Sequence, residues 1–305
     1  MRALVCLHRL FTGTVPKLLF VGDGVEEGSS YHPKKGKVPA DILDNYRAYL
    51  DNLDGIIKAA PEATLWAMGQ VLRLPARVGF GHAVKAGLLA ATTEYVMVVQ
   101  HDHAFNRGFC MQSVLRFMTA HNATYVNLPK SSTFKHLNRC KSDYKVNVRS
   151  KSIDWDGGAA FIPMLFWYDG PHLARRQAYL ELVFTGTSSL PRGHFIEDTF
   201  GHLMMNELRD DYDKWFFSKY NSYAYIIDKR NEEAFVYHLD GRKYVPDAER
   251  AVKGWQENSS LATKEKRLGR VKWNVPYMPK KGGGGGGAGE DDEDNEATFV
   301  GVDDM

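Results

Sequence analysis

A hydrophobic segment that ends in a cluster of acidic and histidine residues constrains the fold more than any other feature. Residues 95–99 (YVMVV) have the composition of a buried β-strand, and the sequence QHDH at 100–103 follows directly. Just upstream, residues 79–91 begin with glycine and are rich in alanine, which predicts a helix. A helix followed by a buried strand with a polar end is typical of open α/β sheets, in which ligands bind at the carboxyl ends of the strands.

The same alternation of strands and helices continues on both sides of this segment. Residues 15–24 (VPKLLFVGDG) predict a strand that presents Asp23, and residues 40–60 have the spacing of an amphipathic helix. Further helices are expected at 106–121, 173–182 and 195–209, a strand at 123–128, and a late β-hairpin from 223–227 and 234–239. This order predicts an α/β fold with a mostly parallel, Rossmann-like sheet flanked by helices.

Composition predicts one globular domain followed by a short tail. With 305 residues, of which 44% are hydrophobic, the chain can bury a substantial core, and residues 1–281 are the expected domain. Residues 282–305 begin with a glycine run and carry eight acidic side chains, so they bury too little apolar surface to offset the entropy of ordering. A disordered tail is expected there. Residues 131–152 are polar and basic with weak periodicity, which indicates a mobile connection or a lid.

Several classes of protein are disfavoured by what the sequence lacks. No run of Lys and Arg is interleaved with aromatic residues, so nucleic acid is not an expected partner. No apolar run approaches the about 20 residues of a membrane span, and residues 1–15 make a poor signal peptide. Cys6, Cys110 and Cys140 are too few for a disulfide framework and lack the spacing of a zinc site.

The first group of candidate residues consists of side chains at two strand ends. Asp102, between His101 and His103, offers the oxygen and nitrogen donors that suit Mn²⁺ or Mg²⁺ bound with phosphate. The structural alternative is that Asp102 caps the next turn while the histidines form local hydrogen bonds. Asp23 is either a nucleotide contact or part of an ordinary Asp-Gly turn.

The second group lies in or next to predicted helices and in a late strand. Glu197 and Asp198 stand at a helix start, where capping is the commonest role and general base catalysis is the alternative. His238, inside an apolar strand, is either a core histidine or a ligand. Lys85 follows the glycine at position 79 and is either a solvated lysine or a cofactor contact.

Taken in order, these motifs resemble the family 2 glycosyltransferases of the GT-A fold, which are nucleotide-diphospho-sugar transferases. In that family a strand ends in Asp-Asp-Gly-Ser, a glycine-containing helix follows, the next strand ends in Asp-x-Asp, and a Glu-Asp pair begins a later helix. The corresponding segments here are 18–25, 79–93, 94–103 and 196–199, while 168–176 resembles the turn before the acceptor-site helix and 236–242 a late histidine strand. The resemblance covers about residues 3–243.

On the donor side, the resemblance implies a site for a nucleotide-diphosphate-sugar and a divalent cation, Mn²⁺ or Mg²⁺. Asp23 would contact the base or ribose, with Gly79 and Lys85 as further cofactor contacts. Asp102 would coordinate the cation that bridges the diphosphate. His238 and His103 are the candidates for additional metal contacts.

On the acceptor side, the resemblance implies transfer of the sugar to a hydroxyl group with inversion. Asp198 would be the base that deprotonates this hydroxyl, and Glu197 would orient it. The expected partners are therefore a nucleotide sugar and a hydroxyl-bearing acceptor.

Three departures from the family pattern support an alternative, a GT-A-like binding protein that has lost catalysis. Gln100 replaces the first acid of Asp-x-Asp, and a neutral amide holds a divalent cation less well than a carboxylate. Gly22 replaces the first Asp of the nucleotide motif. Residues 2–17 resemble the family's first helix without the strand that should precede it, so a truncated N-terminus is expected. The localisation is then open: cytoplasmic as written, or Golgi or ER-associated if an anchor has been lost.

A third reading, nucleotidyl transfer on a related sheet, is the least favoured of the three. That chemistry would want a glycine-rich phosphate loop near the first strand, and none is visible there.

Overall fold

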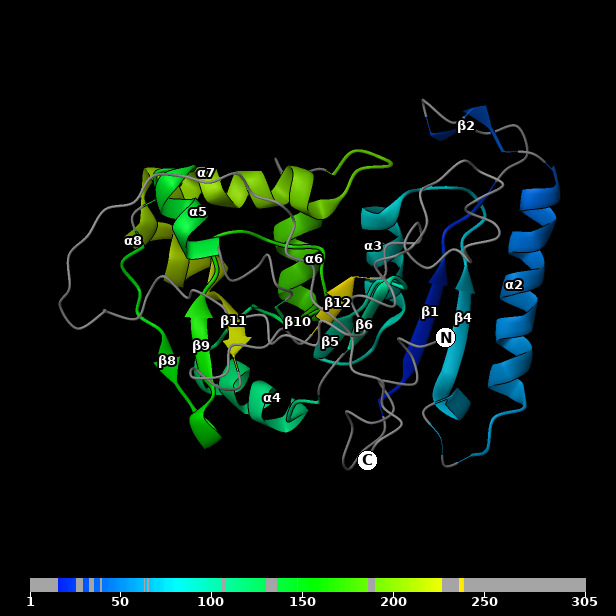
Figure 1. Ribbon diagram of the computed structural model, residues 1–305, viewed down its shortest axis with the longest axis horizontal. Coiled ribbons are helices and arrows are strands. Elements are labelled where there is room, and N and C mark those ends of the chain that lie inside the picture. Colours follow the sequence, from blue (N-terminus) through cyan, green and yellow to red (C-terminus); the bar gives the residue numbers. More distant parts are fainter. Residues whose placement is uncertain are drawn as a thin grey trace, which may run out of the picture.

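A mixed six-stranded sheet runs through the molecule, and helices cover it (Figure 1). This computed structural model describes residues 16–25, 30–32, 36–38, 40–62, 64, 66–105, 108–129, 136–146, 148–185, 190–226 and 236–238. The sheet has the order β5 (Tyr95–Val98), β10 (His172–Arg175), β7 (Tyr125–Asn127), β11 (Ser222–Ile226), β9 (Ala160–Pro163) and β8 (Ile153–Asp154). The predicted α/β class is confirmed.

Three two-stranded ladders accompany the main sheet. They are β1 (Leu18–Gly22) with β4 (Gly69–Arg73), β6 (His103–Phe105) with β12 (Val236–His238), and β2 (Ser30–His32) with β3 (Gly36–Lys37). The β1–β4 pair is parallel, and the other two are antiparallel. Among the described strands, none pairs with the second edge of β1 or with the outer edge of β5.

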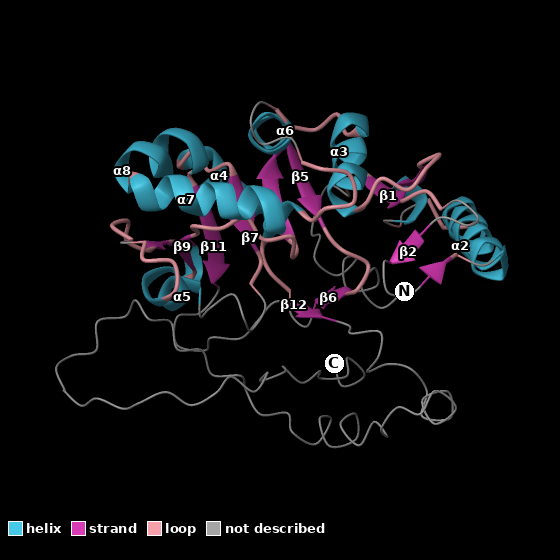
Figure 2. Cartoon of the chain, turned by 90° about the horizontal axis from the view of Figure 1, so that it is seen from above, coloured by secondary structure: helices cyan, strands magenta, loops and turns pink. Residues whose placement is uncertain are grey.

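The structure describes seven helices, of which five overlap segments predicted to be helical and two, at 136–142 and 212–215, do not. The seven helices are α2 (Ala40–Lys58), α3 (Phe80–Ala90), α4 (Met111–Ala120), α5 (His136–Ser142), α6 (Arg176–Phe184), α7 (His202–Asp210) and α8 (Tyr212–Trp215). Short 3-10 turns are η1 (Trp66–Met68) and η3 (Asp156–Gly158), and π-helical turns are η5 (Glu197–Gly201) and η6 (Phe216–Tyr220). Figure 2 shows α3, α6 and α7 on one side of the strands and the β6–β12 ladder on the other.

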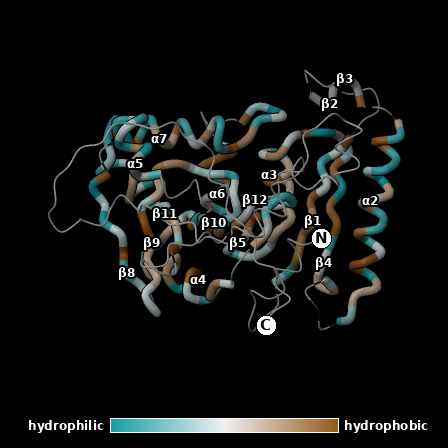
Figure 3. The backbone as a smooth tube through the Cα atoms, viewed as in Figure 1, coloured by the Kyte–Doolittle hydropathy of each residue, from teal (hydrophilic) through white to brown (hydrophobic). Residues whose placement is uncertain are grey.

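Helix α2 illustrates how the apolar pattern positions an element. Leu43, Leu50 and Leu53 are buried on one face, and hydrophobic and hydrophilic residues alternate along the helix in Figure 3. This face packs against β4 and the end of β1. Residues 1–15 and 282–305 lie outside the described residues. The expectations of a missing first strand and a disordered tail concern these segments and stay predictions.

Two expectations about the sheet need correction. The sheet is not mostly parallel, because β10 lies between β5 and β7 and runs antiparallel to both. Within it only the β7–β11 pair is parallel. Residues 172–175, which were expected to open a helix at 173, form β10 instead because strands on both sides offer hydrogen bonds, and α6 begins at Arg176.

The predicted late hairpin is also wrong. Its two strands exist as β11 and β12, but β11 pairs with β7 and β9 while β12 pairs with β6. The stretch 131–152, expected as a mobile connection, contains α5, and His136, Cys140 and Val146 are buried in it. Both differences arise from contacts with segments that are distant in the sequence. Local residue patterns do not reveal such contacts.

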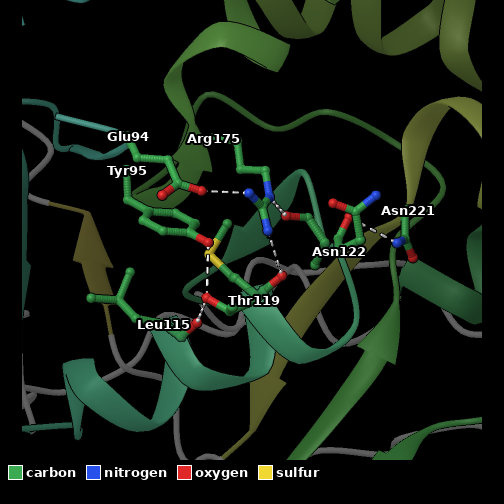
Figure 4. Close-up of polar contacts among 9 residues, drawn as sticks. Glu94, Tyr95, Leu115, Thr119, Asn122, Arg175 and Asn221 are labelled. Carbon is green, nitrogen blue, oxygen red and sulfur yellow. Dashed lines mark hydrogen bonds and ion pairs between the residues drawn. The ribbon is translucent and has the colours of Figure 1, made fainter. Parts of the chain in front are cut away.

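The amino end of β5 is closed by a network around Arg175 (Figure 4). All three guanidinium nitrogens donate: Nη1 to Glu94 at 2.5 Å, Nε to the carbonyl of Ala123 and Nη2 to the carbonyl of Met118, both at 3.2 Å. The guanidinium also lies 5.1 Å from the ring centroid of Tyr95. This end of the sheet is therefore tied to α4 and to the turn before β7.

Candidate active site

The carboxyl end of β5 lies beside the start of β10 and the end of β7. Val98 pairs with His172, which pairs on its other side with Asn127. Segment 100–103 follows this end of β5, and turn 168–171 leads into β10 at the same end. Neighbouring strands are about 4.8 Å apart. The fold thus brings the predicted metal segment and the predicted acceptor turn to the same end of neighbouring strands.

Asp23 follows β1 and holds the loop that begins α3. Its carboxylate accepts hydrogen bonds from the backbone N–H groups of Val78 (2.8 Å) and Gly79 (2.9 Å), one on each oxygen. The structure thus joins two of the predicted nucleotide contacts, Asp23 and Gly79. It also gives Asp23 a structural role, because the carboxylate satisfies N–H groups that precede the helix.

Gly22, where the family has an acid, is explained by packing. It is buried, and a Cβ atom there would lie 3.0 Å from Leu50 Cδ2 and 3.1 Å from the Tyr46 hydroxyl. That hydroxyl donates to the carbonyl of Asp23 at 2.7 Å. A residue with a Cβ atom at position 22 would require these two side chains of α2 to shift.

The loop before α3 packs tightly against the segment that leads to Glu197. Gly79 has a φ of 84°, and a Cβ atom on it would lie 2.4 Å from the Cα of Gly193. The N–H of Gly193 donates to the carbonyl of Val78 at 2.9 Å, and the rings of Phe80 and Phe195 stack with centroids 5.6 Å apart. Glycine is needed at position 79 for both its backbone conformation and this close approach.

Two of the residues predicted to bind a metal, Asp102 and His103, are in contact with each other. Asp102 is about one third exposed, and its Oδ1 lies 3.0 Å from Nδ1 of the buried His103. In the β6–β12 ladder, the backbone of His238 pairs with that of His103. Within the described part of the chain, no group of three metal-binding side chains is found. The chemistry of the Asp102 carboxylate and the adjacent imidazole fits a divalent cation.

Lys85 and His101 are not drawn into this cluster. The Lys85 ammonium lies 5.5 Å from the ring centroid of Phe184 in α6, which is a cation–π arrangement. His101 is exposed next to Asp102. The structure therefore shows Lys85 in contact with a neighbouring helix, and its predicted role as a cofactor contact stays a prediction.

Glu197 and Asp198 lie on the π-helical turn η5. Such turns are rare and frequent at functional sites. Asp198 is exposed, whereas Glu197 is half-buried and turned to the protein: its Oε2 accepts the N–H of Asp169 at 3.1 Å. In return the N–H of Glu197 donates to Asp169 Oδ2 at 3.3 Å. The pair predicted on the acceptor side thus has one solvent-facing carboxylate and one that is tied to the turn at 168–171.

Asp169 is the site residue that the sequence analysis missed. Only 3% of it is exposed, and burial, followed by the nearby Glu197 carboxylate, raises its pKa from 3.8 to about 8. Among the residues that the structure describes, its Oδ1 has no hydrogen-bond partner. The available signal was an acid that directly follows the apolar run 161–168, the same pattern that singled out Asp102.

Aromatic and polar contacts hold the turn that carries Asp169 in place. The carbonyl of Tyr168 accepts the hydroxyl of Tyr125 at 2.9 Å, and the Tyr168 hydroxyl lies 2.8 Å from His136 Nδ1. His136 Nε2 accepts the N–H of Leu165 at 3.0 Å, and burial lowers the pKa of His136 to about 3. The imidazole is therefore neutral and fixes the turn in place.

Comparison with known protein families gives a match to the central part of the chain. The family model for glycosyl transferase family 2 matches residues 50–182. This range contains β4, α3, β5, β10 and the turn with Asp169. No significant match was found among curated proteins or solved structures. In the part of the chain described here, no helix combines the length and apolar character needed to span a membrane.

Proposed function

Starting from a glycosyl transferase family 2 match over residues 50–182, we propose that this protein transfers a sugar from a nucleotide-diphosphate-sugar to an acceptor hydroxyl. The observation that carries the proposal is the pairing of Val98 with His172, which places the segment with Asp102 and the turn with Asp169 at the same end of β5 and β10. Two hydrogen bonds join that turn to Glu197. Family 2 enzymes generally use nucleotide-sugar donors and divalent cations. We propose residues 1–281 as the catalytic unit, because β12, well beyond residue 182, pairs with β6 next to Asp102.

On the donor side, Asp102 would hold Mn²⁺ or Mg²⁺, with His238 as a further contact. His103 is buried and bonded to Asp102, so we assign it the orientation of that carboxylate. A bound cation would neutralise charge on the leaving diphosphate. Asp23 and Gly79 would shape the nucleotide pocket through the loop they hold together.

On the acceptor side, the acceptor hydroxyl oxygen would bond to the anomeric carbon of the sugar while the bond from that carbon to the nucleoside diphosphate breaks, with inversion at the carbon. Asp198 would accept the proton of this hydroxyl. The exposure of Asp198 supports this role because the acceptor must reach it from solvent. Glu197 would set the direction of its neighbour through its hydrogen bond to the turn.

A donor panel tests the proposal. The wild type would be incubated with nucleotide-diphosphate-sugars that vary in base and sugar, with Mn²⁺, Mg²⁺ or a chelator, and release of nucleoside diphosphate would be followed. We expect one donor class to be consumed only with a cation. Equal, background release from every donor under all conditions would contradict it.

The second candidate, a binding protein without catalysis, has specific support. Gln100 supplies a neutral amide where a carboxylate would strengthen cation binding, and the Asp23 carboxylate is already occupied by two backbone N–H groups. Calorimetry with nucleoside diphosphates and Mn²⁺ separates the two candidates. A lack of metal-dependent binding would favour the second.

A further inference from the structure

We propose that Asp169 is a positioning residue for the acceptor-side base: it holds Glu197 at two points and thereby sets where the Asp198 carboxylate is presented. This inference rests on the proposed function. Two hydrogen bonds carry it, Asp169 N–H to Glu197 Oε2 at 3.1 Å and Glu197 N–H to Asp169 Oδ2 at 3.3 Å.

The reciprocal pair fixes more than one side chain. One bond holds the Glu197 side chain and the other holds its backbone, so neither can rotate without breaking a contact with a buried residue. Asp198 follows in the same π-helical turn, and its direction depends on the backbone of that turn. Small errors in the placement of a catalytic group cost large factors in rate.

The surroundings of Asp169 favour its neutral form. The ionisable groups that face it are Glu197 and Asp198 from η5, Tyr125 from β7 and Tyr179 from α6. None of them is a cation, and burial raises the pKa of Asp169 to about 8. Backbone N–H groups of Ile196 and Glu197 act in the opposite direction, to a smaller extent than burial.

The charge on Asp169 therefore changes within a range that assays reach. At neutral pH the carboxyl group is protonated and the pair with Glu197 is intact. Above about pH 8 the Asp169 carboxyl group ionises. Its buried negative charge then lies beside the Glu197 carboxylate, and the two groups repel each other. We expect transfer by the wild type to fall as the pH rises through this value.

The experiment compares Asp169→Asn and Asp169→Ala with the wild type between pH 6 and 9.5. It uses the donor of the panel that the wild type consumes fastest, with saturating Mn²⁺. Asp169→Asn keeps an acceptor for the Glu197 N–H and cannot ionise, so at pH 7 it should retain activity within about threefold and lose the alkaline decline. Asp169→Ala should lower kcat about tenfold or more with the KM for the donor unchanged.

A matched control is Asp156→Asn, an exposed carboxylate paired with Arg116 at 2.7 Å in another part of the molecule. It should behave as the wild type at every pH. An unchanged alkaline decline in Asp169→Asn, or an unchanged kcat in Asp169→Ala, would overturn the proposal. A purely structural role would lower the amount of folded protein without moving the pH profile.

A second readout does not depend on any donor. The infrared C=O band of a protonated carboxylic acid should be present at pH 7 in the wild type and in Asp156→Asn, and absent in Asp169→Asn. If the wild type turns over no donor, the proposed function fails, while the band still reports on the Asp169–Glu197 pair. Absence of the band in the wild type would overturn the proposal that Asp169 is protonated at pH 7, even if transfer occurs.

Discussion

The two ends of β5 are built differently. At its amino end, Arg175 uses all three guanidinium nitrogens, two of them on backbone carbonyls. At the carboxyl edge, a buried carboxyl group on Asp169 has one oxygen without a partner in the described residues, and a π-helical turn carries Glu197. The first arrangement stabilises the sheet. The second retains a buried and incompletely hydrogen-bonded carboxyl group at the candidate site. Destabilising arrangements of this kind are found mostly at functional sites.

The largest expected effect belongs to the carboxyl edge. Asp198→Asn removes the proposed base while leaving the fold alone, because Asp198 is exposed. Transfer should fall by about 10²–10⁴-fold, and the midpoint of urea unfolding should not move. Steady-state rates with the best donor and a denaturant titration measure both. Undiminished transfer would refute the assignment of Asp198 as base.

The amino end should show the opposite response. Arg175→Met leaves the carbonyls of Ala123 and Met118 without their donor, which should cost about 2–3 kcal/mol of unfolding free energy. Arg176→Met is the matched control, because Arg176 makes an exposed hydrogen bond to Thr93 and should cost under about 1 kcal/mol.

Urea unfolding measures the two variants, and kcat per folded molecule should be unchanged in both. Equal stability losses in the two variants would show that Arg175 has no special role at this end of the sheet.

A further effect is expected on the pH dependence of stability. The pKa of Asp169 in the folded protein, about 8, lies above its ordinary value of 3.8, so the folded state keeps a proton that the unfolded chain releases. This contribution is fully present below about pH 4 and is lost as the pH rises to about 8, by at most about 1.4 kcal/mol per pH unit.

Asp169→Asn should therefore gain stability relative to the wild type across the same pH window. Unfolding midpoints at pH 5, 6.5 and 8 measure the gain. Parallel curves for variant and wild type would contradict the raised pKa.

The smallest effect concerns Gln100, which follows β5 and whose carbonyl accepts the N–H of His103 at 3.2 Å. Gln100→Asp adds a carboxylate to the proposed cation site. The Mn²⁺ concentration that gives half-maximal donor consumption should fall about tenfold. Gln100→Glu places the carboxylate one carbon further out and is the matched comparison. No shift in either variant would place the cation elsewhere.

The contrast between the two ends also explains what the sequence could predict. Strand β5, helix α2 and the polar segment 100–103 follow from local spacing, and they were predicted within a few residues. The partner of β12 and the strand β10 depend on contacts with distant segments, so short apolar runs were assigned to a hairpin and to a helix. Local patterns do not encode those contacts.

The candidate site divides in the same way. Asp102 and Glu197 were found because each stands at the end of a recognisable element. The bond between Asp169 and Glu197 joins residues 28 positions apart, and its importance comes from burial, which the sequence of the turn does not display. The close contact of Gly79 with Gly193 is likewise visible only in three dimensions.

The central claim is that Asp102 and Asp198 serve donor and acceptor at one sheet edge. Calorimetry with a nucleoside diphosphate and Mn²⁺, on wild type, Asp102→Asn and Asp198→Asn, tests it most directly. We expect metal-dependent binding to be lost in Asp102→Asn and kept in Asp198→Asn, with donor turnover lost in both. Equal binding by all three proteins would contradict the claim.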